Sequence, residues 1–500
     1  MPVRVVLSGP EARVLEVPEG TWHILADRPV TPGELPDPRA EAVDWPRFGS
    51  RFEELTAAFV PRDGAGNLPC RAFRSLFSGF ELYRAQTPEG DLLLTDDLKT
   101  AGRAGSKRPL PVTSLADYLL FQHPAGTDTF LPGVNRLAPG EALSAHPAEA
   151  LRLFLHQAER LRLPAAVSPG EALERSREAL AGAVAKAVDG VPDAAVLLSG
   201  GIDSTLVALF AGNRAVSLHA EVDCPELACE EDYAEAASKE LGRPLARLVF
   251  SEKDFLGDLE DAVGAIGRPF PVTHYQVVFH NRLFRLPWGL FLSGDLADRL
   301  FGHPLEPQGN WMDSPFSGLV LYCPPPLLCE IFGRDLVESR VRLFEQGLER
   351  LMGPGIDDLA DSRKIDLAIF FGLSYWVHYF RPLAAAYGKR FIAPYGRRAV
   401  FEAAFSCPAR HGLGAPHPKP LLREMLRDLL PGYPADGKKG GSGVPRTRFC
   451  VEGPMEGFFR RRELPSNMDS RFLEVLRQPA RETSALVLLS ACYRLWEDTL

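Results

Sequence analysis

Short apolar runs alternate with helical patterns between residues 195 and 294, and this rhythm constrains the fold more than any other feature of the sequence. The apolar runs are AVLLS (195–199), AVSLHAEV (215–222), LARLVF (245–250) and GLFLSG (289–294). A helical pattern begins at residue 204, another covers 230–241, and two more precede the last run. Strands that alternate with helices in this way form a parallel sheet covered by helices. We therefore expect an α/β fold in this region.

The turn SGGIDS joins the first of these strands to the helical pattern STLVALFAG. Small residues in a turn let backbone N–H groups approach a phosphate, and the following helix N-terminus adds positive potential. The two serine hydroxyls can donate further hydrogen bonds, and the carboxylate of the turn suits a magnesium ion bridging to phosphate. The nucleotide-binding residues that we expect here are Leu198, Ser199, Gly200, Gly201, Asp203 and Ser204. A glycine turn that merely ends a strand is the alternative, and the strand–turn–helix context disfavours it.

Residues 1–163 differ in pattern from the rest of the chain. Short strand-like runs at 3–7, 80–83 and 92–95 are separated by Gly, Pro and Asp turns, which predicts a mainly β domain. A Pro-containing stretch then leads to a helix that Ser168, Pro169 and Glu171 would cap. We place the domain boundary there and expect a second domain over 164–500, whose pattern becomes mostly helical beyond Pro315.

Charge and composition exclude several classes of function. The chain has 56 basic and 65 acidic residues, a net charge of −9, so no overall positive field exists to hold a nucleic acid. No apolar run approaches the roughly 20 residues of a membrane-spanning helix, and the N-terminus does not resemble a signal peptide. The eight cysteines contain no CxxC pair. We expect a cytoplasmic protein with reduced thiols, no zinc site, and neither nucleic acid nor membrane as partner.

Two motifs together resemble a known family. SGGIDS resembles the PP-loop of ATP pyrophosphatases, which release pyrophosphate and leave an adenylylated substrate. SGDLADRLFG (293–302) follows an expected strand and resembles the acidic element of asparagine synthetase-like enzymes. This resemblance implies that the protein binds ATP and Mg²⁺, with Asp203 and Asp298 as metal ligands. It also implies that Ser293 and Gly294 border the nucleotide.

Further segments resemble the same family in the same order along the chain. They are CEEDYAEAASKELG (229–242), RFIAPYGRRAVFEAA (390–404) and KPLLR (419–423), the last of which is similar to the family's KxxLR helix. In KKGGSGVP (438–445), Lys439 is similar in position to the family lysine that contacts the phosphates and the transition state. The resemblance thus extends over nearly the whole chain.

The N-terminal domain is similar to the family's class II glutaminase domain, but the nucleophile is missing. FLPGVNRLAPGEAL (130–143) resembles the end of that domain. Such glutaminases use an N-terminal cysteine, whose thiol and free amine act together. This sequence has Pro2 instead, and we interpret its first cysteine, Cys70, as a buried apolar residue. We therefore expect a degenerate glutaminase-like domain that serves as a scaffold or as a wall for the substrate.

The resemblance also implies a reaction. Amide formation from a free carboxylate is uphill in water, so the carboxylate must first be adenylated before an amine displaces AMP. Lasso-peptide macrolactam cyclases and β-lactam synthetases belong to this branch and use an amine of their own substrate. The missing cysteine therefore favours intramolecular closure.

The choice within this branch depends on a few positions. Asp295 stands where β-lactam synthetase-like enzymes have a tyrosine, and His378 falls near their catalytic glutamate, so either residue could be the base here. The GxxxDxxFG frame of lasso cyclases is present, and the aromatic segment GLSYWVHYF (372–380) could hold a peptide or pack in the core. We favour a lasso-type macrolactam cyclase of natural product biosynthesis. Its partners would be a peptide bearing a carboxylate and an amine and a leader-peptide-processing protein. The alternatives are a β-lactam synthetase-type cyclase and an ammonia-dependent or intermolecular amide ligase.

Two interpretations from other classes of function agree less well with the sequence. An enzyme that adenylates tRNA would need a basic face, and the run RRR at 460–462 is too short to supply one. A catalytically dead scaffold would be expected to lack Asp203, Asp298 or Lys439, yet all three are present.

Overall fold

The architecture is seen in a computed structural model of the 500-residue chain. The structure describes residues 3–40, 42–62, 68–104, 109–147, 151–223, 231–272, 275–302, 325–356, 361–371, 377–407, 418–434 and 484–500, with positions 323, 359, 453, 465, 466 and 468 besides. Statements below refer to these residues.

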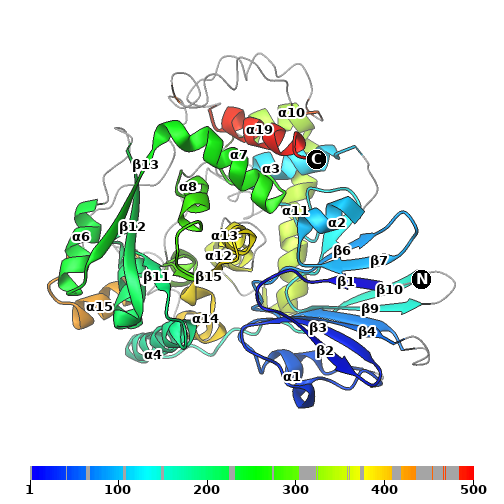
Figure 1. The fold of residues 1–500 in the computed structure, drawn as a ribbon, viewed down its shortest axis with the longest axis horizontal. Coiled ribbons are helices and arrows are strands. Elements are labelled where there is room, and N and C mark those ends of the chain that lie inside the picture. Colours follow the sequence, from blue (N-terminus) through cyan, green and yellow to red (C-terminus); the bar gives the residue numbers. More distant parts are fainter. Residues whose placement is uncertain are drawn as a thin grey trace.

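The first part of the chain forms two β-sheets that face one another (Figure 1). Their strands are β1 (Val3–Val6), β2 (Ala12–Val17), β3 (Gly20–Ala26), β4 (Leu55–Pro61), β5 (Cys70–Arg74), β6 (Tyr83–Gln86), β7 (Leu92–Thr95), β8 (Val134–Arg136), β9 (Glu141–Pro147) and β10 (Leu151–Gln157). One sheet has the order β1-β7-β6-β8 and the other β10-β9-β5-β4-β3-β2. Helices α1 (Trp45–Gly49), α2 (Leu98–Ala104) and α3 (Val112–Phe121) complete this part. The prediction of a mainly β region is confirmed.

The core between these two sheets contains the first cysteine of the sequence. Cys70 is 1% exposed and packs with Ala58, Leu94 and Leu143, which come from both sheets. Burial raises the pKa of its thiol to about 12, so the thiol stays protonated. The interpretation of Cys70 as a buried apolar residue is therefore confirmed.

The second part of the chain is built on a parallel sheet. Its strands are β11 (Ala194–Leu197), β12 (Ala215–Asp223), β13 (Leu245–Ser251), β14 (Leu290–Leu292) and β15 (Arg390–Ile392). The order β13-β12-β11-β14-β15 puts β11 in the centre, with every neighbour parallel. Successive strands extend from β11 in one direction up to β13 and then reverse to its other side. Open sheets of this kind bind ligands at the carboxyl ends of the strands on either side of such a reversal.

Helices make up most of the other described elements of this part, and they alternate with strands β11 to β14 as the pattern predicted. They are α4 (Pro169–Val188), α5 (Ile202–Ala211), α6 (Glu231–Glu240), α7 (Phe255–Ile266), α8 (Tyr275–Leu283), α9 (Ala297–Phe301), α10 (Pro325–Phe332), α11 (Arg334–Met352), α12 (Asp361–Phe370), α13 (Val377–Ala386), α14 (Arg398–Phe405), α15 (Pro420–Leu429) and α19 (Ser484–Glu497). Helices α4, α5, α14 and α15 pack together, and α7, α8 and α13 form a second group. None of the helices in the described ranges combines the length and apolar character needed to cross a bilayer.

Helix α4 begins where the sequence predicted a cap. The Ser168 hydroxyl accepts a hydrogen bond from the Glu171 N–H at 3.2 Å, and Pro169 is the first helical residue. Leu180 and Val184 on the inner face are fully buried. This helix carries the chain from the β-rich part to β11.

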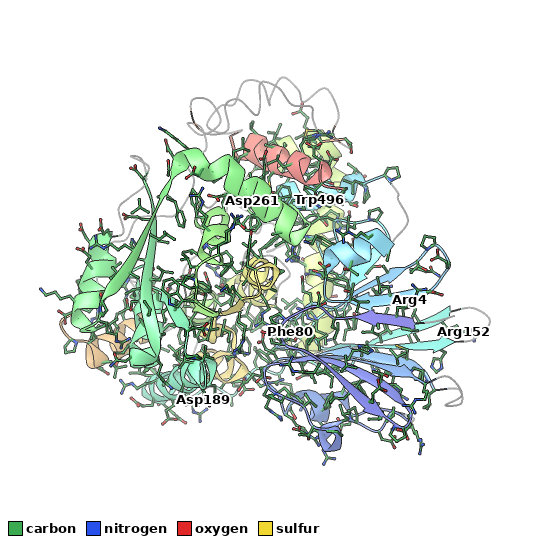
Figure 2. All side chains as sticks on the ribbon, in the orientation of Figure 1. Arg4, Phe80, Arg152, Asp189, Asp261 and Trp496 are labelled. Atoms are coloured by element: carbon green, nitrogen blue, oxygen red, sulfur yellow. The ribbon has the colours of Figure 1, made fainter. Side chains whose placement is uncertain are left out.

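The two parts lie side by side (Figure 1), and ion pairs and a shared core join them. Phe80 lies at the junction, as Figure 2 shows, with the guanidinium of Arg381 4.4 Å from its ring centre. Farther along, Arg340 of α11 pairs with the buried Asp117 of α3 at 2.5 Å. The β-rich part is therefore firmly docked on the parallel-sheet part.

Candidate active site

The SGGIDS loop lies at the carboxyl end of the central strand β11 and leads into α5. Leu198 continues the strand, its N–H donating to the Leu218 carbonyl at 2.8 Å. Gly200 has a φ of +69°, a left-handed conformation that favours glycine. A Cβ atom at Gly200 would lie 2.2 Å from the carbonyl carbon of Tyr233, which belongs to α6. Both the turn and the close approach of α6 therefore require glycine at this position.

The two serines of the loop hold it together from within. The Ser204 hydroxyl accepts from the Ser199 N–H at 3.2 Å and lies 3.1 Å from the Ser199 hydroxyl. The Gly201 carbonyl accepts from the Ser204 hydroxyl at 3.2 Å. The loop is thus preorganised at the N-terminus of the ten-residue helix α5, a geometry suited to binding phosphate.

The second motif, SGDLADRLFG, reaches the same place from β14. Gly294 packs directly on the first loop, because a Cβ atom there would lie 2.7 Å from the Ser204 nitrogen and 2.8 Å from the Asp203 Cβ. Ser293 is buried, and its hydroxyl accepts from the N–H of the half-buried Asp295 at 3.4 Å. The two loops therefore meet at the carboxyl edge of the sheet.

Between Asp295 and Asp298 the backbone is strained. Leu296 has a φ of +72°, which is uncommon for a residue with a side chain. Its side chain is 7% exposed and packs toward Gly396. Burial of this side chain holds the turn in place, and strain of this kind is frequent at functional sites.

Lys419 joins the two predicted metal ligands. Its Nζ lies 2.5 Å from Asp203 Oδ2 and also contacts Asp298 Oδ1, so both carboxylates share one ammonium group. Burial lowers the pKa of Lys419, but the two carboxylates outweigh this effect and raise it well above its usual value. The lysine is therefore charged. Sequence reasoning assigned KPLLR only to a helix and missed this contact.

Two tyrosines support the loop from other segments. The Tyr433 hydroxyl donates to the Gly200 carbonyl. The hydroxyl of Tyr395, in the 3-10 turn Pro394–Gly396, donates to the Asp203 carbonyl at 3.3 Å. Tyr395 and Lys419 thus place parts of the family-like segments 390–404 and 419–423 beside SGGIDS.

The described part of the structure does not show where several predicted site residues lie. Lys439, with the rest of KKGGSGVP, lies outside the described residues, as does the run at 460–462. His378 is in α13, but the described part of the structure does not include its side chain. Tyr379 and Phe380 are fully buried, and the Tyr379 hydroxyl donates to the Gln122 carbonyl at 2.5 Å. These two aromatic residues are core residues and cannot line a peptide channel.

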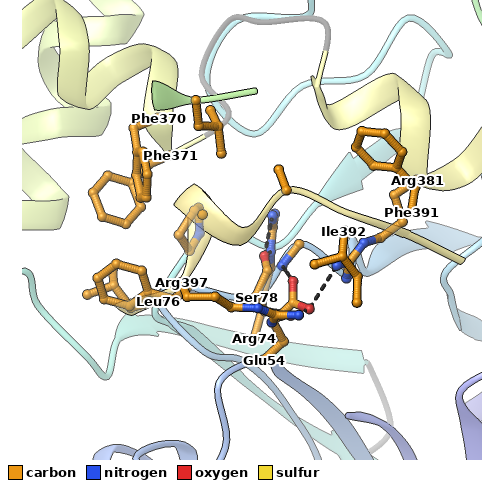
Figure 3. A pocket seen from close by; sticks show the side chains of 16 residues that line it. Glu54, Arg74, Leu76, Ser78, Phe370, Phe371, Arg381, Phe391, Ile392 and Arg397 are labelled. Atoms are coloured by element: carbon orange, nitrogen blue, oxygen red, sulfur yellow. Dashed lines mark hydrogen bonds and ion pairs between the residues drawn. The ribbon is translucent and has the colours of Figure 1, made fainter. Parts of the chain in front are cut away.

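A small cavity of about 70 Å³ lies beside the site, between the two parts of the chain (Figure 3). Arg381, Arg397 and Glu54 form one wall, and phenylalanines including Phe370 and Phe371 form another. The buried Glu54 carboxylate lies 2.8 Å from Arg381 and 2.8 Å from Arg397. This ion-pair cluster connects the β-rich part to the Pro394–Gly396 turn.

A parallel sheet whose two glycine-containing loops meet at its carboxyl edge defines a nucleotide-using α/β enzyme. Comparison with protein families gives a match to the asparagine synthase model over residues 175–483, more than half of the chain. The chain therefore belongs to the asparagine synthase family, and it is an ATP-dependent carbon–nitrogen ligase. A search of curated proteins found no match.

Proposed function

We propose that the protein adenylates a carboxylate of its substrate and that an amine of the same substrate then displaces AMP to form an amide. The favoured substrate is a peptide, and the reaction is macrolactam formation of the lasso-peptide type. One observation supports the adenylation step above all. The SGGIDS loop and Asp298 lie together at the carboxyl edge of the sheet, where Lys419 contacts both Asp203 and Asp298.

In the first step a carboxylate oxygen of the substrate attacks the α-phosphorus of ATP, and pyrophosphate leaves. The N-terminus of α5 and the hydroxyls of Ser199 and Ser204 would bind the phosphates. Ser293 and Gly294 would border the nucleotide, because Gly294 packs on the same loop. These residues would orient ATP.

Asp203 and Asp298 would hold Mg²⁺, and the donor set fits this ion. No group of three or more His, Cys, Asp or Glu side chains within the described ranges could hold a metal. Mg²⁺ commonly takes one or two carboxylates and completes its shell with phosphate oxygens and water. Asp203 and Asp298 lie close enough for both to contact one ammonium group, that of Lys419, so both carboxylates could also reach one metal ion. When bound, Mg²⁺ would neutralise phosphate charge.

In the second step the substrate amine attacks the acyl carbon, and AMP leaves with the bonding electron pair. Asp295 or His378 would accept the proton of the incoming ammonium, and Lys439 would stabilise the charge that develops on the departing phosphate. The amine is proposed to come from the substrate because the described residues of the β-rich part expose no thiol: Cys70 is buried.

Adenylation is tested by measuring AMP and pyrophosphate on incubation with ATP, Mg²⁺ and candidate peptides. Asp203→Asn should abolish both products. Asp189→Asn is the matched control, since Asp189 is an exposed residue at the end of α4, and it should leave turnover unchanged. Equal turnover in both variants would contradict the proposed site.

Mass spectrometry tests the intramolecular step. A cyclised product is lighter than its substrate by one water and contains no added nitrogen. A peptide ring supports the lasso-type assignment, and a small strained ring would move the assignment to a β-lactam synthetase-type cyclase. Incorporation of ¹⁵N-ammonia or of a separate amine would refute intramolecular closure and indicate an ammonia-dependent or intermolecular ligase.

A further inference from the structure

Lys419 occupies the place that the proposed function gives to a metal ion. Its side chain is 10% exposed, against 21% for Asp203 and 35% for Asp298, so it is the most buried member of the group. Its ammonium contacts one oxygen of each carboxylate. The Lys419 ammonium thus lies between the two carboxylates.

The backbone of Lys419 is built into this arrangement. Lys419 has a φ of +60°, a left-handed conformation that a residue with a side chain seldom adopts. Its N–H donates at 3.1 Å to the carbonyl of Gly302, and the Gly302 N–H in turn donates at 3.2 Å to the carbonyl of Asp298. Pro420 then opens α15. A strained backbone tied to the residue that ends α9 fixes the side chain toward Asp298 and Asp203.

Resting on the proposed function, we propose that Lys419 is the resident counter-ion of the nucleotide-free site and that it excludes divalent cations until ATP arrives. A divalent ion alone would have to displace the ammonium or sit beside it, and like charges at such short range repel strongly. ATP removes this repulsion between the metal ion and the lysine, because its negatively charged triphosphate can bind both cations. Metal binding would therefore require nucleotide.

The affinity for a divalent ion without nucleotide tests this role. Mn²⁺ is the probe, and its free concentration is followed by electron paramagnetic resonance. Lys419→Met preserves the unbranched chain up to Cε and removes the charged ammonium group, so it should bind Mn²⁺ at least tenfold more tightly than the wild type. Lys186→Met is the matched control, because Lys186 is 72% exposed and pairs with Glu53 at the surface. An affinity of Lys419→Met no tighter than that of the wild type would overturn the proposal.

Thermal stability gives a readout that does not depend on activity. Lys419→Met leaves two carboxylates without their shared cation, so its melting temperature should be low in the absence of metal and should rise when Mg²⁺ alone is added. The wild type should respond little to Mg²⁺ alone and strongly to Mg²⁺ with α,β-methylene-ATP. If Lys419→Met does not fold, the wild-type comparison still decides, since a large shift with Mg²⁺ alone would refute the exclusion.

These outcomes separate this inference from the proposed function. If the wild type binds Mn²⁺ neither alone nor with α,β-methylene-ATP, the metal site itself is wrong and both proposals fail. If it binds Mn²⁺ with the analogue while Lys419→Met and wild type have the same affinity for Mn²⁺ alone, only the role of Lys419 is refuted.

Discussion

Replacement of Glu54 by glutamine should loosen the contact between the β-rich part and the active site. The Glu54 side chain is 9% exposed, accepts from the Gly79 N–H at 3.0 Å and pairs with Arg381 and Arg397. Arg397 directly follows the Pro394–Gly396 turn, whose Tyr395 hydroxyl contacts Asp203. Glu54→Gln removes the charge that holds both arginines and nearly preserves the shape of the side chain.

The size of the effect follows from the pKa of Glu54. Burial alone would raise this pKa, but the charges of Arg381 and Arg397 outweigh burial and lower it from the usual 4.5 to about 2. At 1.36 kcal/mol for each pKa unit, this difference corresponds to about 3 kcal/mol of folding free energy. Loss of one partner of a buried ion pair typically costs about 3–5 kcal/mol, which agrees. Because the folded pKa is depressed, the contribution is complete above pH 4.5 and disappears as the pH falls toward 2.

Urea unfolding at several pH values measures this contribution. Glu54→Gln should lower the free energy of unfolding by about 3 kcal/mol at pH 7, with a smaller difference below pH 4.5. Glu53→Gln is the matched control, because the neighbouring Glu53 also crosses the junction but pairs with the exposed Lys186, and exposed pairs contribute about 0–1 kcal/mol. Equal losses in the two variants would refute the reasoning. The adenylation rate of Glu54→Gln should also fall, since the turn at Tyr395 loses its anchor.

Three further predictions concern the site. Gly200→Ala should abolish ATP binding in calorimetry, because the added Cβ would collide with the Tyr233 backbone. Gly190→Ala is the control, since Gly190 also has a positive φ but lies in open space, and this variant should bind ATP normally. ATP binding by both variants would contradict the close packing at Gly200. Lys439→Ala should slow turnover about a hundredfold while ATP still binds, as expected for the loss of one contact to developing charge, and near-native turnover would identify it as the wrong lysine. Glutamine should yield no glutamate in an enzymatic assay, since Cys70 is buried and protonated, and any measured glutaminase activity would refute this expectation.

The parallel-sheet part was predictable because its signals are local. The strand predicted at 215–222 is Ala215–Asp223, and the helix predicted at 230–241 is Glu231–Glu240. Each strand is an apolar run bounded by turn residues, and each helix has its own period, so neither depends on distant contacts. The Ser168 cap was predictable for the same reason.

The junction was less predictable, because long-range contacts decide its structure. A strand was predicted at 80–83, whereas β6 is Tyr83–Gln86. The Phe80 carbonyl accepts from the Thr56 hydroxyl at 3.0 Å, and its ring lies under Arg381. These contacts hold Phe80 outside the ladder, and no local pattern reports them. The buried positions of Tyr379 and Phe380 likewise depend on packing against other segments.

The active site was only partly predictable from the sequence. Asp203 was expected to bind magnesium because a carboxylate in a phosphate-binding turn suits that ion, and Asp298 because its motif resembles the acidic element of the family. Lys419 lies 216 residues from Asp203, and its left-handed backbone depends on a hydrogen bond to Gly302. The one local signal is that Lys419 precedes Pro420, which disfavours a helical conformation for the lysine and so separates it from α15. That signal predicts that Lys419 lies outside the helix, but it does not predict which residues Lys419 contacts. The contact of the Lys419 ammonium with Asp203 and Asp298 therefore cannot be predicted from local sequence, because it forms only when three distant segments fold together.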